Sequence, residues 1–396
     1  MASACSDGKQ RSVEANDRET EDLLTKNYLP ISVDGEGNLL AEDLAAFAKK
    51  IEKVKILALG EQTHGAGSVF SLKTDLIKYL HQHHGFDLLI LESGMYDVNE
   101  IIKKSKMGES INALAPGNIF YMYANSAEVT PLFDYVDNSA NTAMPLTMVG
   151  FDSQHTGGLS LAGLVNDLNA AYQQNTSNKH SHPLSQNLLQ QIQAVLEGNT
   201  SRFPIAQEQA YFIELNKLAE HFRLSGNGFW FRITQGLIAQ SKKQWQLEDN
   251  RSKEMGENIK WWSEQYPDKK IIVWAHTWHL TKKGNNQVNA GQVVHSAFAE
   301  QYYVVHFTGK QGEYLSYLDL TNKLVAPLQK NAIEYKLGEV SPSKINYLEN
   351  KALPLENSTM AVFANDYQQT LPAREWTTYW DGMFILKNIT PATYGQ

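Results

Sequence analysis

Apolar runs of strand length recur along this chain, and they limit the folds open to it more than any other feature. There are five such runs, at residues 54–60, 86–93, 145–152, 270–276 and 302–309. Each run is apolar almost continuously rather than at alternate positions, which is typical of strands covered on both faces. Helical patterns lie between them, the clearest over residues 68–85 with Gly85 as its expected C-terminal cap. This alternation predicts an α/β fold in which a mostly parallel sheet is flanked by helices.

The stretch from residue 160 to residue 265 has a different pattern. It contains three helical segments and no convincing strand. We therefore expect a helical insertion, either a lid or a subdomain, between two strands of the sheet. Residues 310–396 add shorter strand-like pieces, and no internal repeat is present. Residues 23–396 are accordingly predicted to form one α/β domain.

The N-terminal residues 1–22 are polar and charged, and they are predicted to be disordered. Cys5 is the single cysteine of the chain, so intrachain disulfides and cysteine-ligated zinc clusters are excluded. Small residues before Cys5 and polar ones after it resemble the end of a bacterial lipoprotein signal that lacks its hydrophobic part. Two bacterial locations stay open: the cell envelope, through a lipid on Cys5, or the cytoplasm.

Charge and hydropathy exclude two classes of partner. The net charge is −8 and no block of lysine or arginine stands out, so the surface should repel nucleic acid. No apolar stretch approaches the roughly 20 residues of a transmembrane helix. We therefore expect a small-molecule partner, with neither nucleic acid nor a membrane span.

Acidic and imidazole side chains follow four of the five predicted strands. In an open parallel sheet, ligands bind beyond the carboxyl ends of the strands, where the connecting loops meet. A single histidine or aspartate at such a place is more often a structural residue or a helix cap than a catalyst. The coincidence over four strands carries the prediction of a site, provided that the strands are neighbours. The residues concerned are Glu61, His64, Glu92, Asp152, His155, His276 and His279.

Two cations on predicted helices are expected to join this cluster. Lys73 lies in the middle of an apolar stripe, so it should project toward the sheet, unless its stem packs while its ammonium escapes to water. Arg251 and Asn258 share the apolar face of another helix. An inward-facing arginine needs an anionic partner, and the acidic cluster could supply one.

The motifs that are missing narrow the chemistry. The chain has no G-x-S-x-G elbow, no phosphate-binding glycine loop and no thiol near the cluster. What remains is histidine and carboxylate chemistry on water, which means hydrolysis of an ester or an amide. A metal site built from His64, His276, His279 and the carboxylates stays open, although "HTWH" is not the H-E-x-x-H of zinc proteases. A third alternative is a non-catalytic protein that binds a hydrophobic ligand, since aromatic-rich segments are present.

Several segments together resemble the erythromycin esterase family. They are "LGEQTHG", "KYLHQHHGFDLLILESGMYD", "GFD", "RSKEMGENIKWW", "VWAHTWHL" and "DGMFILKNITPATY". The resemblance spans about residues 23 to 392, and the combination is more specific than any one motif. It implies an α/β fold with helical insertions and hydrolysis of an ester or macrolactone, usually without a metal, so no cofactor is expected.

The resemblance also implies roles for individual residues. His64 matches the histidine that is assigned as the base activating water, and Glu61 and Glu92 would orient or charge-balance the imidazoles. His276 and His279 match a histidine motif and would assist at the carbonyl oxygen. The substrate would be bound by Arg251, Asp152, Lys73, Tyr121 and Tyr123.

Three positions depart from the macrolide esterases. Lys73 stands where those enzymes have an arginine, and lysine keeps the charge but loses the bidentate fork. Tyr121 and Tyr123 stand where the family usually has tryptophans beside the substrate cleft. These departures bear on whether the substrate is a macrolide and not on whether the protein hydrolyses esters. The expected substrate is therefore a small ester, with a macrolide as one candidate.

Overall fold

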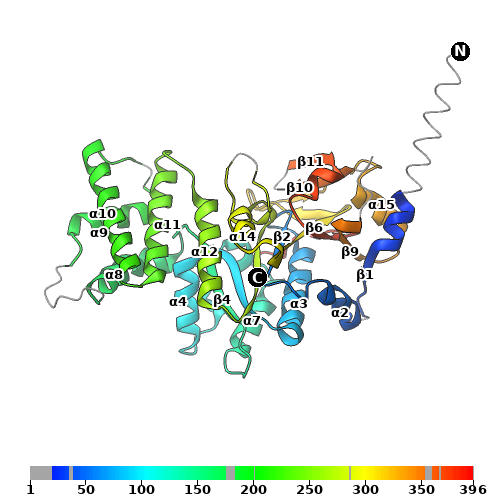
Figure 1. Cartoon of the computed structure of the whole chain (residues 1–396), viewed down its shortest axis with the longest axis horizontal. Helices are drawn as coiled ribbons and strands as arrows, with labels where there is room; N and C mark the ends of the chain where they lie inside the picture. Colours follow the sequence, from blue (N-terminus) through cyan, green and yellow to red (C-terminus); the bar gives the residue numbers. More distant parts are fainter. Residues whose placement is uncertain are drawn as a thin grey trace, which may run out of the picture.

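An eight-stranded sheet forms the centre of the computed structural model (Figure 1). The structure describes residues 20–34, 39–174, 183–199, 201–284, 287–352, 359–364 and 367–395. The strand order is β1-β9-β12-β6-β2-β5-β3-β4. The strands are β1 (Tyr28–Ile31), β2 (Ile56–Glu61), β3 (Phe86–Gly94), β4 (Thr147–Asp152), β5 (Lys270–His276), β6 (Tyr302–Gly309), β9 (Ile345–Glu349) and β12 (Gly382–Leu386).

Most of this sheet is parallel. The strands from β12 to β4 pair in parallel, whereas β9 pairs antiparallel with β12 and with β1 at one edge. All five apolar runs of the sequence form strands of the parallel part. The predicted α/β class, with a mostly parallel sheet and flanking helices, is confirmed.

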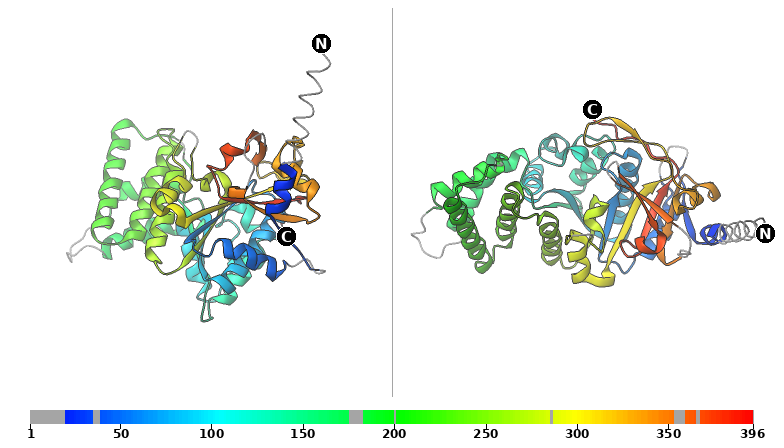
Figure 2. Two further views of the ribbon diagram at one scale, coloured as in Figure 1. Left: turned by 45° about the vertical axis from the view of Figure 1, so that its right-hand side comes forward. Right: turned by 90° about the horizontal axis from the view of Figure 1, so that it is seen from above.

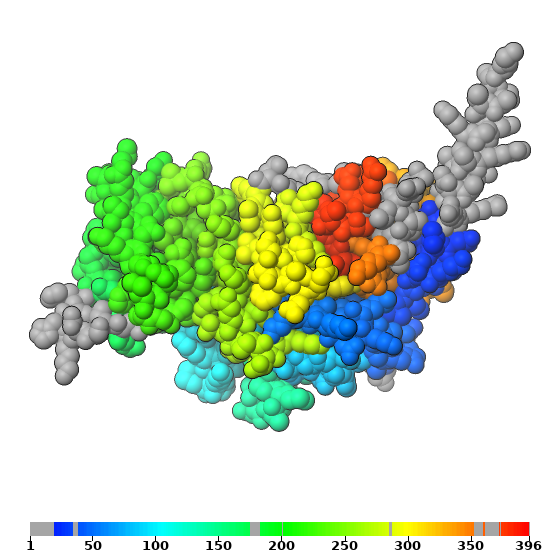
Figure 3. Space-filling view, in the orientation of Figure 1, coloured from blue at the N-terminus to red at the C-terminus, as the bar shows by residue number. Residues whose placement is uncertain are grey.

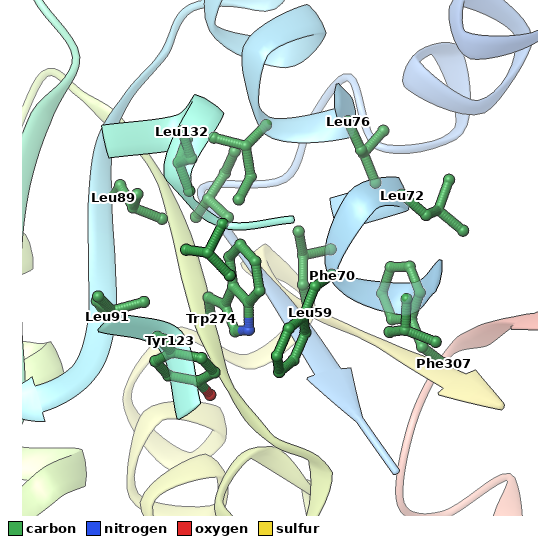
Figure 4. Packing of buried hydrophobic residues seen from close by; sticks show 14 of the residues in the cluster. Leu59, Phe70, Leu72, Leu76, Leu89, Leu91, Tyr123, Leu132, Trp274 and Phe307 are labelled. Carbon is green, nitrogen blue, oxygen red and sulfur yellow. The ribbon is translucent and has the colours of Figure 1, made fainter. Parts of the chain in front are cut away.

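Helices cover both faces of the sheet because successive strand residues alternate between two cores. Leu57 and Leu59 of β2 pack in one core with α3 (Gly67–His84), α2 (Ala41–Lys50) and α7 (Thr130–Ser139). Ile56 and Ala58 pack in the other with α14 (Ala290–Phe298), α15 (Ile333–Val340) and α12 (Arg251–Gln265). Figure 4 shows the first core around Leu59, Phe70 and Trp274. Gly85 ends α3 with a left-handed φ of 70°, as its sequence position predicted.

Five helices connect β4 to β5, in the stretch where the sequence has no strand pattern. They are α8 (Gly158–Gln174), α9 (Gln186–Leu196), α10 (Ile205–Leu224), α11 (Gly228–Gln244) and α12. The first four extend beyond the β4 edge of the sheet (Figures 1 and 2). In Figure 3 they form the green end of the molecule, next to the yellow-green atoms of α12.

The remaining elements are short or lie at the periphery. Residues 20–27 are helical, and two small hairpins, β7–β8 and β10–β11, stand apart from the main sheet. Their bounds, with those of the remaining helices, are α4 (Met95–Ser105), α5 (Ile111–Leu114), α6 (Tyr121–Ala124), α13 (Thr277–Leu280), β7 (Glu313–Leu315), β8 (Asn322–Leu324), β10 (Thr359–Ala364), β11 (Tyr367–Pro372), α16 (Ala373–Trp376) and the 3-10 turns Ala299–Gln301 and Asn350–Ala352.

Two predictions concern the N-terminal part of the chain. The expected disordered segment 1–22 and the lipid site at Cys5 fall mainly on residues 1–19, which lie outside the described residues. Within the described part of the chain, no helix is both long enough and apolar enough to cross a lipid bilayer.

The order of the strands creates a crevice between β2 and β5. From β2 the chain crosses to β3 on one side through α3, whereas from β5 it crosses to β6 on the other side through α14. Because such crossovers are right-handed, the two connections leave on opposite faces, and α3 and α14 indeed pack in different cores. The carboxyl ends of β2 and β5 therefore mark the place where a ligand site is expected.

Candidate active site

The four strand ends that carry the predicted acidic and imidazole residues are neighbours in the sheet. The strands β2, β5, β3 and β4 lie side by side, and Glu61 at the end of β2 pairs in register with His276 at the end of β5. A pocket of about 480 Å³ opens at this edge. The predicted site residues that line it are His64, Glu92, Tyr121, Asp152, Arg251, His276 and His279.

His64 is joined to Glu61 in the loop that follows β2. The His64 Nδ1–H donates to Glu61 Oε1 at 3.1 Å. Because a carboxylate can only accept, this bond places the proton of the neutral ring on Nδ1 and leaves Nε2 as the basic nitrogen. Glu61 is fully buried, whereas 9% of the His64 side chain is exposed. The pair has the geometry of an imidazole base oriented by a carboxylate.

Glu61 is kept ionised by two donors behind it. Lys73 Nζ donates to the carboxylate and, at 2.7 Å, to Leu59 O, and Tyr123 Oη donates to Glu61 Oε1 at 2.5 Å. Burial alone would raise the pKa of Glu61, but the charge of Lys73 and the contact with His64 hold this pKa well below its ordinary value. Burial also raises the pKa of the Tyr123 phenol, which therefore remains a donor.

The assignment of Lys73 and Tyr123 to substrate binding does not match their position. Both side chains are completely buried, neither lines the pocket, and Tyr123 packs against Trp274 and Phe70 (Figure 4). The prediction that Lys73 projects toward the sheet is confirmed, and escape of its ammonium to water is ruled out. These two residues contact Glu61 and do not line the pocket, so they hold the Glu61 carboxylate in place.

His276 has both ring nitrogens engaged by the main chain. Its Nε2–H donates to Gln62 O at 3.1 Å, and its Nδ1 accepts from Trp278 N at 3.2 Å, which caps α13. Its own backbone N–H donates to Glu92 Oε2 at 2.8 Å. Since no ring N–H remains for a carbonyl oxygen, the expected assistance by His276 at that oxygen is not supported by this arrangement. Its ring instead packs 5.0 Å from that of His64.

Arg251 connects two carboxylates that line the pocket. Its Nε and Nη2 donate to the two oxygens of Asp152 at 3.0 and 2.5 Å, and Nη2 lies 3.6 Å from Glu92 Oε1. Burial would raise the pKa of Asp152, but Arg251 lowers it below its ordinary value. The inward arginine thus has the anionic partner that its helix position required.

His279 lies beside this ion pair. Its Nε2 is 3.3 Å from Glu92 Oε1, and its Nδ1 is 3.0 Å from Ser252 Oγ. Burial, together with the charge of Arg251, lowers the pKa of His279 to about 3, so the ring is neutral. Arg251 Nη1 donates to its Nε2 at 3.5 Å, so the proton of the neutral ring lies on Nδ1 and is donated to Ser252 Oγ.

His155 does not reach the pocket, although it follows β4. Its Nε2–H donates to Ile233 O at 3.2 Å and its backbone N–H to Gln240 Oε1 at 2.9 Å, both on α11. It therefore joins the sheet to the helical insertion.

The aromatic-rich segments 229–231 and 261–262 also lie away from the pocket. They pack against the core and do not line the pocket, so they give no support to a binding-only role.

Three aromatic residues complete the pocket, of which the sequence had indicated Tyr121 alone. Phe120, Tyr121 and Tyr317 form what we term the aromatic wall. The His64 ring lies 4.7 Å from that of Phe120 and 5.6 Å from that of Tyr317, and Tyr121 Oη donates to Tyr317 O. Asp97 lines the pocket as well and accepts from Ser160 N at 2.7 Å at the start of α8.

One group of side chains could hold a metal ion. Glu61, His64 and Glu92 can each offer a ligand atom, and these atoms lie within 4.8 Å of one another. Nitrogen and carboxylate oxygen suit zinc or manganese. However, the oxygens of Glu61 already accept from Lys73, Tyr123 and His64. One acceptor position of the carboxylate, on Oε2, is therefore left for a metal ion.

The fold and the site together define a hydrolase built on a parallel α/β sheet, with imidazole and carboxylate groups at the strand ends. The family model described as erythromycin esterase matches residues 81–383. The chain therefore belongs to the erythromycin esterase family, as the motifs of the sequence indicated.

Similar proteins agree with this placement. YbfO of Bacillus subtilis (strain 168), named provisionally as a hydrolase, is 27% identical over 343 residues, which cover 74% of this chain and 72% of YbfO. A succinoglycan biosynthesis protein of known structure superposes with a TM-score of 0.75 at 15% identity, covering 95% of this chain and 98% of that one. A histidine-to-asparagine mutant of the erythromycin esterase EreC, in its open conformation, superposes with a TM-score of 0.63 at 15% identity. The match covers 90% of this chain and 96% of that one. At these identities the two structures show a common fold alone.

The buried histidines predict a fold that loses stability in acid. Burial depresses the pKa of His155 to about 4 and those of His276 and His306 to about 3. The unfolded chain, with histidine pKa values near 6.5, therefore binds more protons below that pH, and the free energy of unfolding falls on acidification from about pH 6.5 to the folded-state values. Each histidine contributes up to about 1.4 kcal/mol per pH unit in this window. Asp97 acts in the opposite direction, since burial raises its pKa to about 6.

Urea unfolding at several pH values between about 4 and 7 measures this dependence. The variant His155→Gln keeps a donor for Ile233 O but does not titrate. The slope of its free energy of unfolding against pH should therefore be smaller by the equivalent of about one proton. Equal slopes for this variant and the parent chain would contradict the assignment.

Proposed function

We propose that this protein hydrolyses carboxylic esters, with His64 as the general base that activates water. One observation carries the proposal: His64 is bonded through Nδ1 to a buried, ionised Glu61, at the wall of a pocket of about 480 Å³. This arrangement supplies a basic Nε2 and stabilises the imidazolium that forms when Nε2 takes a proton. Family membership supports hydrolysis in general, and the ester bond is our proposal.

The proposed reaction uses the residues in the following order. Nε2 of His64 takes a proton from water, and the resulting hydroxide adds to the ester carbonyl carbon. Arg251, the cation that lines the pocket, stabilises the negative charge that develops on the carbonyl oxygen. The C–O bond to the alcohol then breaks, and the leaving alkoxide receives the proton from His64 Nε2. Glu92 and Asp152 hold Arg251 in place.

Mass spectrometry of an ester panel tests this function. The panel contains simple carboxylic esters and 14-membered macrolactones, because the family takes its name from erythromycin. We expect conversion of at least one simple ester to an acid and an alcohol, or of a lactone to a product heavier by one water. A panel in which no compound changes would overturn the proposal. The macrolactones decide only whether the substrate range extends to that class.

A metal-dependent hydrolase is the second candidate, and the convergence of Glu61, His64 and Glu92 favours it. The two candidates differ in what a chelator does. Under the metal-free proposal, ester hydrolysis persists after dialysis against EDTA, and elemental analysis finds less than one equivalent of transition metal. Loss of activity with EDTA, restored by zinc or manganese, would transfer the assignment to the second candidate.

A further inference from the structure

The hairpin formed by β7 and β8 carries a hydrogen-bonded tip beside the candidate active site. Leu315 N donates to Gly65 O at 2.9 Å, which ties the hairpin to the loop that holds His64. A side chain at position 65 would place its Cβ 1.6 Å from Leu315 O, so only glycine permits this close approach. At the tip, Leu320 N donates to Ser316 O at 2.9 Å, and Asp319 Oδ1 accepts from Thr321 N at 3.1 Å.

Two leucines of this tip are placed against the usual preferences of a turn. Leu318 is 66% exposed and Leu320 is 43% exposed. Leu320 also has a φ of 53°, in the left-handed region that glycine or asparagine adopts more readily than leucine. Neither exposure nor backbone conformation favours leucine here, so the folding of the turn does not explain these residues. Exposed apolar residues that gather at one place commonly mark a binding surface.

Tyr317 joins the tip to the aromatic wall of the pocket. Tyr317 directly precedes Leu318, lines the pocket, and accepts from Tyr121 through its carbonyl oxygen. The side of the pocket that carries Arg251 is charged. His64 packs against the aromatic wall, so a carbonyl group placed at His64 has an apolar surface on one side.

We propose that the aromatic wall and the two leucines of the tip bind the apolar arm of the substrate. The substrate class is then a carboxylic ester with a medium-length alkyl or aryl group. This inference rests on the proposed ester hydrolysis and specifies the substrate of the same site. The apolar arm lies on Phe120 and Tyr317 and extends to Leu318 and Leu320, while the carbonyl stays beside His64.

Hydrolysis of a matched pair of esters tests this assignment. The measured quantity is the ratio of kcat/KM for p-nitrophenyl octanoate to kcat/KM for p-nitrophenyl acetate. The test variant combines Leu318→Gln with Leu320→Asn, and asparagine suits the left-handed backbone, so the turn should still fold. We expect the octanoate to acetate ratio to fall about tenfold, at the low end of what lost apolar contacts produce. The control variant Leu224→Gln removes another leucine, 71% exposed at the end of α10, and should leave the ratio unchanged.

The outcomes separate this inference from the proposed function. If the parent protein hydrolyses both esters and the double variant keeps the same ratio, the subsite is wrong and ester hydrolysis stands; the leucines would then face another partner, such as a protein or a membrane. If the parent hydrolyses neither ester, binding of nonan-2-one, a ketone that cannot be hydrolysed, is measured by the change in intrinsic tryptophan fluorescence, to which Trp278 in the pocket contributes. Weaker binding by the double variant would support the apolar subsite without catalysis. Equal binding would overturn the subsite.

Discussion

Replacing His64 with alanine is expected to lower kcat for a responsive ester by a factor on the order of 10²–10⁴, the range that a positioned general base contributes. The alanine variant loses Nε2, the proton acceptor, and also the partner of the buried Glu61 at 3.1 Å. Glu61 keeps its donors Lys73 and Tyr123, so its charge remains paired and the fold should persist.

Two controls make the His64 result specific. Circular dichroism and urea unfolding should show a folded variant, with a free energy of unfolding close to that of the parent chain. The variant His83→Ala removes an exposed imidazole on α3 and should retain full activity. A folded His64→Ala protein with parental kcat would show that His64 is not the base, whatever the substrate.

A second measurement tests the role of Glu61 in the same step. In the variant Glu61→Gln the acceptor becomes an amide, which can present either an oxygen or an N–H to His64. Part of the population should then hold His64 in the other tautomer, with its proton on Nε2, so kcat should fall while KM changes little. The same loss in kcat with a parallel rise in KM would instead indicate disturbed substrate binding.

The parallel part of the fold could be predicted because its strands are buried on both faces. Such strands are almost continuously apolar, as residues 56–60 and 271–275 show. The strands β1 and β9 escaped notice because they are short and pair antiparallel beside the parallel part of the sheet, where pairing and not apolar content defines them. Pro30 in β1 is typical of an edge.

The candidate site was predictable as a set of residues but not as a set of roles. Strand-end positions brought together Glu61, Glu92 and His276, although the sequence could not show that β5 inserts between β2 and β3. Both ring nitrogens of His276 are hydrogen-bonded to main-chain atoms of Gln62 and Trp278. The positions of these atoms follow from the placement of β5 between β2 and β3. Tyr317 reaches the pocket from a hairpin about 250 residues away from His64, a distance over which no local pattern gives a signal.

The buried ion pair of Lys73 and Glu61 is expected to have the largest effect on stability. Both side chains are fully inaccessible, and the Lys73 ammonium lies over the rings of Trp274 and Phe307 at 5.0 and 5.2 Å. The variant Lys73→Met fills a similar volume but leaves the Glu61 carboxylate buried without its cation. Removal of one partner from a buried ion pair typically lowers the free energy of unfolding by about 3–5 kcal/mol. Urea unfolding at neutral pH measures this change.

A double variant distinguishes loss of charge balance from loss of packing. Lys73→Met combined with Glu61→Gln removes both charges, and Tyr123 can still donate to the amide oxygen, so most of the lost stability should return. Hydrolysis should not return with it, because a neutral glutamine no longer stabilises the imidazolium of His64. A double variant as unstable as Lys73→Met alone would show that the lysine acts through its packed stem. In that case the ionisation of Glu61 would not depend on Lys73.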